Sequence, residues 1–297
     1  MSTLAVIGAG VIGLSWARLA REHDWDVTIY DPRDDIADVV AAELGDDPRV
    51  RVVADIAAAV AEADLVQENG PERLPIKQDL FARVIAHARP DAVLATSSSS
   101  ITATLITAGL EHASRVLVGH PFNPPELMPL VEVVPGRDTD DEATKRAVEL
   151  YERLGRVPVV IHREMPGFVA NRLQGALSRE AVYLVQQGVV SPADLDVIMR
   201  NSLGLRWATI GPFEGNVLGG GPGGIRHLYA GVGAETSKIE FGSPATDPDQ
   251  MEKVISQVEQ TYGTGTEAFD RLRRQRDTRT RAVLAALRTA DGDDSGR

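Results

Sequence analysis

The sequence of 297 residues contains no cysteine. This absence excludes disulfide frameworks, thiolate zinc sites, iron–sulfur clusters and cysteine nucleophiles, and we expect no metal site. No segment reaches the roughly 18 consecutive apolar residues of a membrane span, so no membrane partner is expected. The apolar run at residues 4–13 is interrupted by glycines and follows no basic residue, which argues against a signal peptide and predicts a cytoplasmic protein.

Positive charge is also scarce. The formal net charge is −12, from 43 acidic and 31 basic side chains, and only four of the basic residues are lysines. Such a surface repels phosphate backbones, so we expect no nucleic-acid partner. Hydrophobic residues make up 43% and charged residues 25%, which excludes a disordered chain, a collagen and a coiled coil. At roughly 150 residues a domain, the length predicts two domains.

Short apolar strands alternate with helical patterns through the first half of the chain. The expected strands are residues 4–7, 27–30, 50–53, 65–67, 93–96, 116–119 and 130–134, and the expected helices are 14–22, 36–44, 56–63 and 76–88. This alternation predicts βαβ units with right-handed crossovers. We therefore expect the α/β class, with a doubly wound parallel sheet.

The pattern changes near residue 165. A long helical period covers residues 167–187, and Ser191 followed by proline predicts the start of a helix over 193–201. Nothing after residue 165 has the pattern of a strand. The sequence thus predicts an α/β domain at residues 1–164 and an all-α C-terminal domain at 165–297.

Two segments of the second domain are rich in glycine or polar residues. The run at residues 219–224 predicts a flexible loop, either a lid over a site or a turn. Residues 291–297 predict a frayed polar tail. The 167–187 helix is apolar on much of its circumference, which fits an intramolecular core or a partner subunit equally.

A glycine motif, Gly8-Ala-Gly-Val-Ile-Gly13, lies between the first expected strand and helix. Gly8 permits a tight turn, Gly10 lets the backbone approach a pyrophosphate, and Gly13 lets the helix pack closely on the strand. The helix N-terminus, with Val11 and Ile12, offers N–H groups and a positive dipole end to phosphates. The motif in this context predicts a Rossmann-type dinucleotide site.

Asp31 ends the second expected strand, where a carboxylate accepts hydrogen bonds from the adenine-ribose hydroxyls. It would repel a 2′-phosphate, so it predicts NAD rather than NADP as the cofactor. The alternative is a turn residue before Pro32. FAD uses the same glycine turn, but a two-domain chain of this length favours NAD.

Two ionisable residues follow in the last expected strands. His120 stands at the end of a strand, where it faces the crevice in which ligands of open α/β sheets bind; alone, it fits a structural histidine equally well. Glu132 lies inside an apolar strand, and a carboxylate is rarely buried there without a partner. A His–Glu pair would satisfy both groups and raise the basicity of the imidazole. Spacing alone does not show that they touch.

Over nearly its whole length the sequence resembles the 3-hydroxyacyl-CoA dehydrogenase superfamily. The resemblance is carried by the glycine turn and by residues 119–124, 130–133, 166–173 and 203–214. It implies an NAD-binding domain, a helical domain that binds substrate and mediates homodimerisation, and a His–Glu catalytic pair, which His120 and Glu132 match. Glu72 and Lys77 match the segment next to the nicotinamide ribose.

The resemblance also implies how substrate is held. Ser99 matches a substrate-binding serine, but four serines in a row leave Ser98 and Ser100 as alternatives. Asn171 matches an asparagine that holds the substrate oxygen. In the implied mechanism, His120 takes the alcohol proton while the hydride passes to NAD.

Two features favour a small free 3-hydroxy acid over an acyl-CoA. Acyl-CoA enzymes of the superfamily usually carry a long, lysine-bearing helical excursion after the second strand, whereas residues 32–67 are acidic and contain no lysine. Further segments resemble the gulonate 3-dehydrogenase, lambda-crystallin and carnitine 3-dehydrogenase branch, namely residues 67–74, 123–125, 189–192, 194–196, 204–208 and 211–214. We therefore expect oxidation of a gulonate-, carnitine- or 3-hydroxybutyrate-like acid. A 3-hydroxyacyl-CoA dehydrogenase and a non-enzymatic NAD-binding structural or sensor protein are the alternatives.

A small hydroxy acid requires a counter-charge. Arg206, and after it Arg226, are candidates, since a guanidinium grips a carboxylate with two hydrogen bonds. Trp207 and Phe213 are candidates for a cage around a quaternary ammonium group. The plainer alternatives are solvated surface arginines and aromatic core residues.

Overall fold

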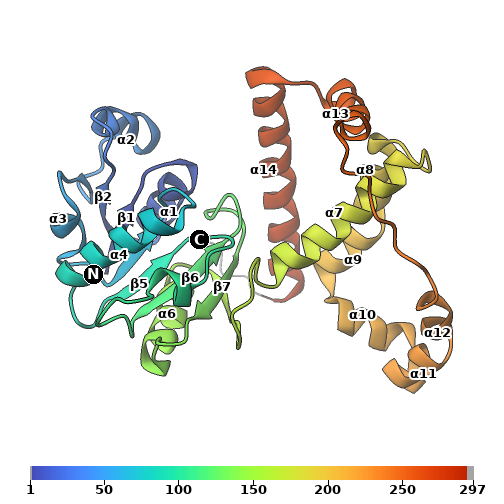
Figure 1. The fold of residues 1–297 in the computed structure, drawn as a ribbon, viewed down its shortest axis with the longest axis horizontal. Helices are drawn as coiled ribbons and strands as arrows, with labels where there is room; N and C mark the ends of the chain where they lie inside the picture. Colours follow the sequence, from blue (N-terminus) through green and yellow to red (C-terminus); the bar gives the residue numbers. More distant parts are fainter. Residues whose placement is uncertain (1, 293–297) are drawn as a thin grey trace. The chain divides into compact units, whose positions relative to one another are not determined.

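The structure, a computed structural model, describes residues 2–292. Contacts within the chain define two compact units, Met1–Arg172 and Leu173–Arg297 (Figure 1). The sequence placed the boundary at residue 164; the segment that follows remains with the first unit because Phe168 is buried in its core. Most of the tail expected at residues 291–297 lies outside the described residues.

The first unit is built on one eight-stranded sheet, in the order β3-β2-β1-β4-β5-β6-β7-β8. The strands are β1 (Thr3–Ile7), β2 (Asp26–Tyr30), β3 (Val50–Val52), β4 (Leu65–Glu68), β5 (Val93–Thr96), β6 (Val116–Pro121), β7 (Leu130–Pro135) and β8 (Val157–Val160). All neighbouring strands are parallel except β6 and β7, which pair antiparallel. The predicted doubly wound α/β sheet is confirmed, with a reversed pair of strands at one edge.

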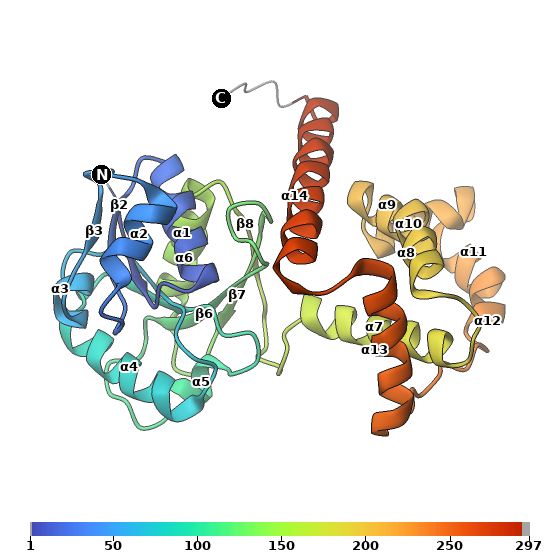
Figure 2. The same cartoon turned by 90° about the horizontal axis from the view of Figure 1, so that it is seen from above.

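Helices cover both faces of this sheet (Figure 2). They are α1 (Val11–Glu22), α2 (Ile36–Leu44), α3 (Ile56–Val60), α4 (Leu74–His87), α5 (Ala103–Ile106) and α6 (Asp141–Arg153). Successive residues of a strand point to opposite faces. Leu4 and Val6 of β1 therefore pack with α1, α2 and α6, while Ala5 and Ile7 pack with α3, α4 and α5. The two cores leave the carboxyl ends of the parallel strands free for a site.

The sequence patterns left three elements of this unit unassigned: α5, α6 and β8. Helix α6 carried a readable signal, because Asp140 accepts a hydrogen bond from the backbone of Ala143 and caps the helix. Its buried residues also recur at helical spacing. Strand β8 carried little sequence signal for a strand. Its exposed residues at the sheet edge, Val157 and Val159, are apolar, so polar and apolar residues do not alternate along it.

The second unit contains only helices among its described residues. They are α7 (Ala170–Gln186, which begins in the first unit), α8 (Pro192–Asn201), α9 (Leu203–Thr209), α10 (Pro212–Gly219), the 3₁₀ turn η1 (Gly221–Gly223), α11 (Gly224–Ala230), α12 (Val232–Thr236), α13 (Pro248–Tyr262) and α14 (Gly265–Ala290). The all-α prediction is confirmed, and Ser191 caps α8 as expected. Within residues 2–292, no helix is long and apolar enough to cross a bilayer.

Of the two alternatives for residues 219–224, a lid or a turn, the structure shows the turn. This segment folds as the end of α10, a 3₁₀ turn and the start of α11. Gly221 and Gly224 have φ angles of +56° and +61°, which glycine adopts without strain. The glycines therefore reverse the chain between two helices.

Gly13 offers a test of the packing between α1 and the turn before it. A β-carbon at Gly13 would overlap the carbonyl oxygen of Gly8, whereas a β-carbon at Gly10 would have nothing within 4 Å. We expect Gly13→Ala to lower the free energy of unfolding by about 1–3 kcal/mol, because the helix must move away from the turn. Urea unfolding measures this, with Gly10→Ala as the matched control. Equal stability of the two variants would contradict the packing argument.

Candidate active site

His120 and Glu132 lie opposite each other on neighbouring strands. The antiparallel register of β6 and β7 pairs them directly, so their side chains emerge on the same face of the sheet. His120 Nδ1 lies 2.8 Å from Glu132 Oε2, and the two residues are 3% and 2% exposed. The structure thus brings together the two residues that sequence spacing could not join.

The second oxygen of Glu132 holds the start of helix α7. Glu132 Oε1 accepts hydrogen bonds from the backbone N–H groups of Val169, at 2.9 Å, and Ala170, at 3.0 Å. Burial alone would raise the pKa of Glu132, but the hydrogen bonds from His120 and these two amides lower it below the ordinary value. An ionised Glu132 requires the imidazole proton at Nδ1, which leaves Nε2 as the proton acceptor.

The environment of His120 Nε2 is formed by aromatic rings and by Asn171. Phe122 and Phe168 lie 5.2 Å and 5.3 Å from the imidazole, centroid to centroid. Asn171 Nδ2 lies 3.5 Å from His120 Nε2 and 3.5 Å from the carbonyl oxygen of Ser99. The sequence did not point to Phe168, which is buried with a φ of +50° at the entrance to α7.

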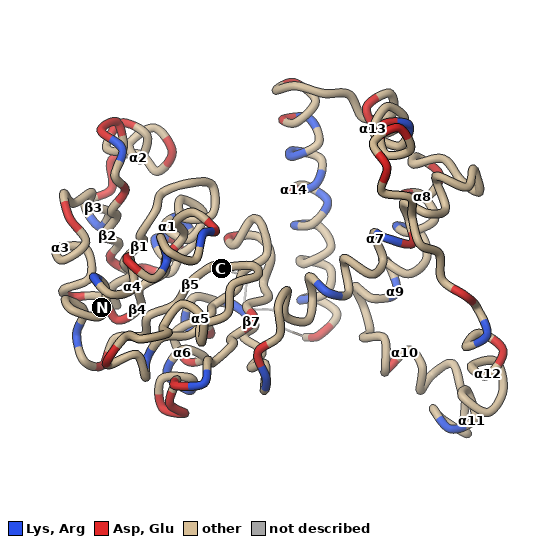
Figure 3. The backbone as a smooth tube through the Cα atoms, viewed as in Figure 1, with Lys and Arg blue, Asp and Glu red and all other residues tan. Residues whose placement is uncertain are grey.

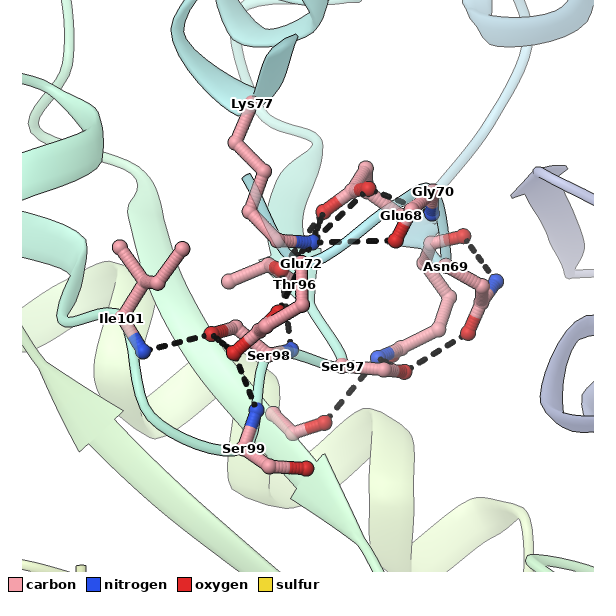
Figure 4. Close-up of polar contacts among 12 residues, drawn as sticks. Glu68, Asn69, Gly70, Glu72, Lys77, Thr96, Ser97, Ser98, Ser99 and Ile101 are labelled. Carbon is pink, nitrogen blue, oxygen red and sulfur yellow. Dashed lines mark hydrogen bonds and ion pairs between the residues drawn. The ribbon is translucent and has the colours of Figure 1, made fainter. Parts of the chain in front are cut away.

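The four-serine turn is organised by Glu72 (Figure 4). Glu72 Oε1 accepts hydrogen bonds from the hydroxyls of Ser98 and Ser100, at 2.7 Å and 3.0 Å. It also accepts the backbone N–H groups of Ser99 and Ser100, at 3.1 Å and 3.0 Å. Burial opposes ionisation of Glu72, but the Ser98 hydroxyl and the charge of Lys77 lower its pKa. Among the described residues the Ser99 hydroxyl has no hydrogen-bond partner, so it is the one in this turn left for a ligand.

Lys77 lies inside the protein rather than at its surface. Its side chain is 1% exposed, and its ammonium group lies 2.8 Å and 3.1 Å from the two carboxylate oxygens of Glu68. Glu68 also accepts hydrogen bonds from the Thr96 hydroxyl and the Gly70 amide, both at 2.6 Å. The sequence placed Lys77 and Glu72 next to the cofactor ribose. In the structure they support the two turns that follow β4 and β5.

The glycine motif has the shape that its three positions require. Gly8 has a φ of +93°, and a β-carbon there would lie 3.0 Å from the carbonyl group of Asn69. Gly10 faces open space, and the first turn of α1 beyond it has no side-chain cap. Its N–H groups, from Val11 onwards, therefore face a volume into which a phosphate group fits.

Asp31 lies beside this turn and is already paired. Asp31 Oδ2 accepts a hydrogen bond from the Ala9 amide at 2.8 Å, and Oδ1 accepts one from Arg33 Nε at 2.8 Å. Burial would raise the pKa of Asp31, but the bonds from Arg33 and Ala9 lower it. No sequence pattern pointed to Arg33, although it stands two residues after the expected ribose ligand.

A pocket of about 650 Å³ opens between these residues and helix α4. Its lining residues include Gly8, Gly10, Asp31, Arg33, Asn69, Ile76 and Leu80. It lies at the carboxyl ends of β1, β2 and β4, where nucleotides bind in open α/β sheets. The shape, the free helix N-terminus and the carboxylate fit the adenosine end of a dinucleotide.

The residues expected to hold a substrate carboxylate or ammonium group lie in the second unit. Arg206 lies on α9 and Arg226 on α11. Trp207 and Phe213 are 45% and 73% exposed. Neither aromatic residue is therefore a core residue of its unit, and both are accessible for contact with a ligand or a partner.

Comparison with known families matches both halves of the chain. The profile described as "3-hydroxyacyl-CoA dehydrogenase, NAD binding domain" matches residues 3–48 and 46–165, and that of the C-terminal domain of the same family matches residues 167–257. The chain therefore belongs to the 3-hydroxyacyl-CoA dehydrogenase family, and it is an NAD-dependent dehydrogenase.

Individual relatives cover almost the whole chain. An L-carnitine dehydrogenase of Pseudomonas aeruginosa is 39% identical, over 97% of this chain and 94% of its own. A 3-hydroxyacyl-CoA dehydrogenase of Gibberella moniliformis is 38% identical, over 96% and 94%. The solved structure of an NAD⁺-dependent dismutase, a pyridine carboxylic acid 5-dehydrogenase, is 29% identical, covers 98% and 99%, and has a TM-score of 0.79.

The depressed pKa of Glu132 predicts a pH-dependent contribution to stability. We expect Glu132→Gln to lower the free energy of unfolding by about 1–3 kcal/mol at neutral pH, because charged hydrogen bonds are lost. The ionised carboxylate stabilises the folded state above the unfolded pKa, about 4.3. The difference between wild type and variant should shrink as the pH falls below that value toward the lower folded pKa. Urea unfolding from pH 7 to pH 3 measures this, and a constant difference would contradict it.

Proposed function

We propose that the chain oxidises the secondary alcohol of a small, carnitine-like 3-hydroxy acid to the 3-keto acid, with NAD as the hydride acceptor. One observation carries the proposal: the bond from His120 to Glu132 directs His120 Nε2 toward Asn171 and the Ser99 turn. A proton acceptor beside two polar groups is what a dehydrogenase needs at the reacting alcohol.

In the proposed mechanism, His120 Nε2 accepts the proton of the substrate hydroxyl. NAD, when bound, would supply the acceptor for the hydride of the carbinol carbon. The carboxylate of Glu132 stabilises the imidazolium that forms, and Ser99 and Asn171 orient the substrate oxygen. A positioned base of this kind contributes about 10²–10⁴ to the rate. The glycine turn from Gly8 to Gly13 would hold the pyrophosphate, and Asp31, which is bonded to Arg33 in this structure, would hold the adenine ribose.

The named relatives support a carnitine-like acid among the candidate substrates. Several are L-carnitine dehydrogenases at 35–39% identity. Carnitine carries a carboxylate and a quaternary ammonium group. Arg206 is our candidate for the carboxylate, and the exposed Trp207 and Phe213 are candidates for the ammonium group.

A second candidate substrate is a 3-hydroxyacyl-CoA thioester. It is favoured by the Gibberella relative, which is named for that activity and matches nearly as well. The absence of lysine from residues 32–67 argues against it. A non-enzymatic role is disfavoured, because a scaffold has no need for a buried His120–Glu132 pair that directs Nε2 toward Asn171.

The substrate class is tested by following NADH formation with L-carnitine, L-gulonate, 3-hydroxybutyrate and 3-hydroxybutyryl-CoA side by side. We expect turnover of a free acid, with L-carnitine best, and none of the thioester. His120→Gln should abolish turnover and leave the Kd for NADH unchanged. Turnover of the thioester alone would overturn the substrate proposal, and an active His120→Gln would overturn the assigned base.

We also propose that the second unit forms a homodimer. Large apolar side chains of its helices are exposed in the single chain, among them Leu173, Leu205, Phe213, Leu218 and Phe241. Helix α14 has no buried residue along its whole length. It also carries seven arginines against three acidic residues (Figure 3), in a chain whose net charge is −12. A second copy of this acidic chain would cover the exposed apolar side chains and would bring negative charge to the arginines of α14. The cytoplasmic location expected from the sequence stays a prediction.

Size-exclusion chromatography with light scattering tests the dimer. We expect a mass about twice the 31.9 kDa of one chain. Added salt should weaken the association if the arginines of α14 contribute, because screening reduces charge attraction. A monomer at micromolar concentration and low salt would contradict the proposal.

A further inference from the structure

A buried amide lies behind the candidate site. Gln67 is on β4 and is 0% exposed, although a buried amide is costly unless its hydrogen bonds are made. Gln67 Nε2 donates to Ser97 Oγ at 2.7 Å and to the carbonyl oxygen of Gly119 at 3.0 Å. Gln67 Oε1 accepts the hydroxyl of Tyr151 at 2.7 Å. Both N–H groups and the oxygen are therefore paired.

Gly119 and Tyr151 together fix which way this amide points. The carbonyl oxygen of Gly119 can only accept, so Nε2 faces it and Oε1 is left for the Tyr151 hydroxyl. The ring of Tyr151 is buried between α6 and the sheet, packed against Trp16, and burial raises the pKa of its hydroxyl, which therefore keeps the proton that it donates to Oε1. The hydroxyl also occupies the place of a side chain at Gly119, since a β-carbon there would overlap it. The absence of a side chain at Gly119 is what lets Tyr151 reach the amide.

The two N–H groups of Gln67 connect two different parts of the site. One holds Ser97, whose hydroxyl donates to Asn69 Oδ1 at 2.7 Å. Asn69 in turn packs its backbone against Gly8 of the cofactor turn. The other N–H group holds the carbonyl of Gly119, the residue before His120. The amide of Gln67 thus connects the turn at Gly8 with the strand that carries His120.

We propose that Gln67, held in place by Tyr151, is a positioning residue that sets the distance between His120 and the cofactor-binding turn. The proposal rests on the proposed function, since it concerns the base and cofactor of that reaction. Gln67 acts through Gly119 and Ser97 and touches neither substrate nor the reacting atoms. Because a misplacement of about 1 Å can cost about 100-fold in rate, a small shift of β6 is enough to be measured.

Tyr151→Phe removes one hydroxyl and keeps the ring. We expect kcat to fall about 10-fold, with the KM for the hydroxy acid and the Kd for NADH within about threefold of wild type. The primary deuterium isotope effect on kcat, measured with substrate deuterated at the carbinol carbon, should rise as hydride transfer becomes slower. Gln67→Met, which removes the amide, should lower kcat further.

Thr28→Val is the matched control for loss of a buried hydrogen bond. Thr28 Oγ1 donates to the carbonyl of Ala59 at 2.7 Å in the same unit, and Thr28 is 3% exposed. Thr28→Val should lower the unfolding midpoint much as Tyr151→Phe does, but leave kcat and the isotope effect unchanged. If Tyr151→Phe lowers stability alone, or if both variants lose kcat equally, the proposal is overturned.

A measurement without turnover separates this proposal from the proposed function. The chain has six histidines, and the ring ¹⁵N signals of His120 can be assigned by their loss in His120→Gln. We expect Tyr151→Phe to shift these signals in the free protein and Thr28→Val to leave them in place. Unmoved His120 signals would refute the positioning role, even if wild type turned over none of the four substrates. Shifted signals would support it in either case.

Discussion

The carboxylate of Glu132 is the interaction on which the rest of the site depends. A charge buried this deeply is tolerated only when hydrogen bonds replace its water, and three donors surround it: His120 and the amides of Val169 and Ala170. These donors come from β6 and from the start of α7, while Glu132 itself is on β7. One carboxylate therefore determines the tautomer of the imidazole and the point at which α7 begins, and so where Asn171 lies relative to His120 Nε2.

Two other carboxylates, at or after the carboxyl end of β4, are also surrounded by hydrogen-bond donors. Glu68 is neutralised by Lys77 and bonded by Thr96 and Gly70, and Glu72 is enclosed by donors of the serine turn. Buried ion pairs of this kind are weak sources of stability, because desolvation cancels much of their attraction. Their effect is geometric, since each carboxylate ties a turn to a strand end. The turns of the site are therefore tied to carboxylates of the protein, one buried at Glu68 and one 40% exposed at Glu72.

Local sequence predicted the elements far better than the contacts between them. The glycine motif, Asp31 and most strands of the first unit follow from periodicity and turn chemistry, which act over a few residues. Contacts such as Arg33 on Asp31 or Tyr151 on Gln67 depend on strand order and register, which no local pattern contains. The partner of Lys77 shows this best. The lysine was recognised by its motif, but its burial depends on α4 placing the ammonium group beside Glu68 of β4 and Thr96 of β5.

The four residues proposed for proton transfer, namely His120, Glu132, Ser99 and Asn171, all belong to the first unit. The exposed Arg206, Trp207 and Phe213 belong to the second. Under the proposed function, the proton-transfer residues and the candidate substrate-binding residues therefore lie in different units. A structure with a TM-score of 0.79 to this chain is that of a pyridine carboxylic acid 5-dehydrogenase, at 29% identity. A scaffold shared at this level constrains the NAD-dependent reaction but not the acid, because the candidate acid-binding groups lie on short helices that can change without disturbing the sheet.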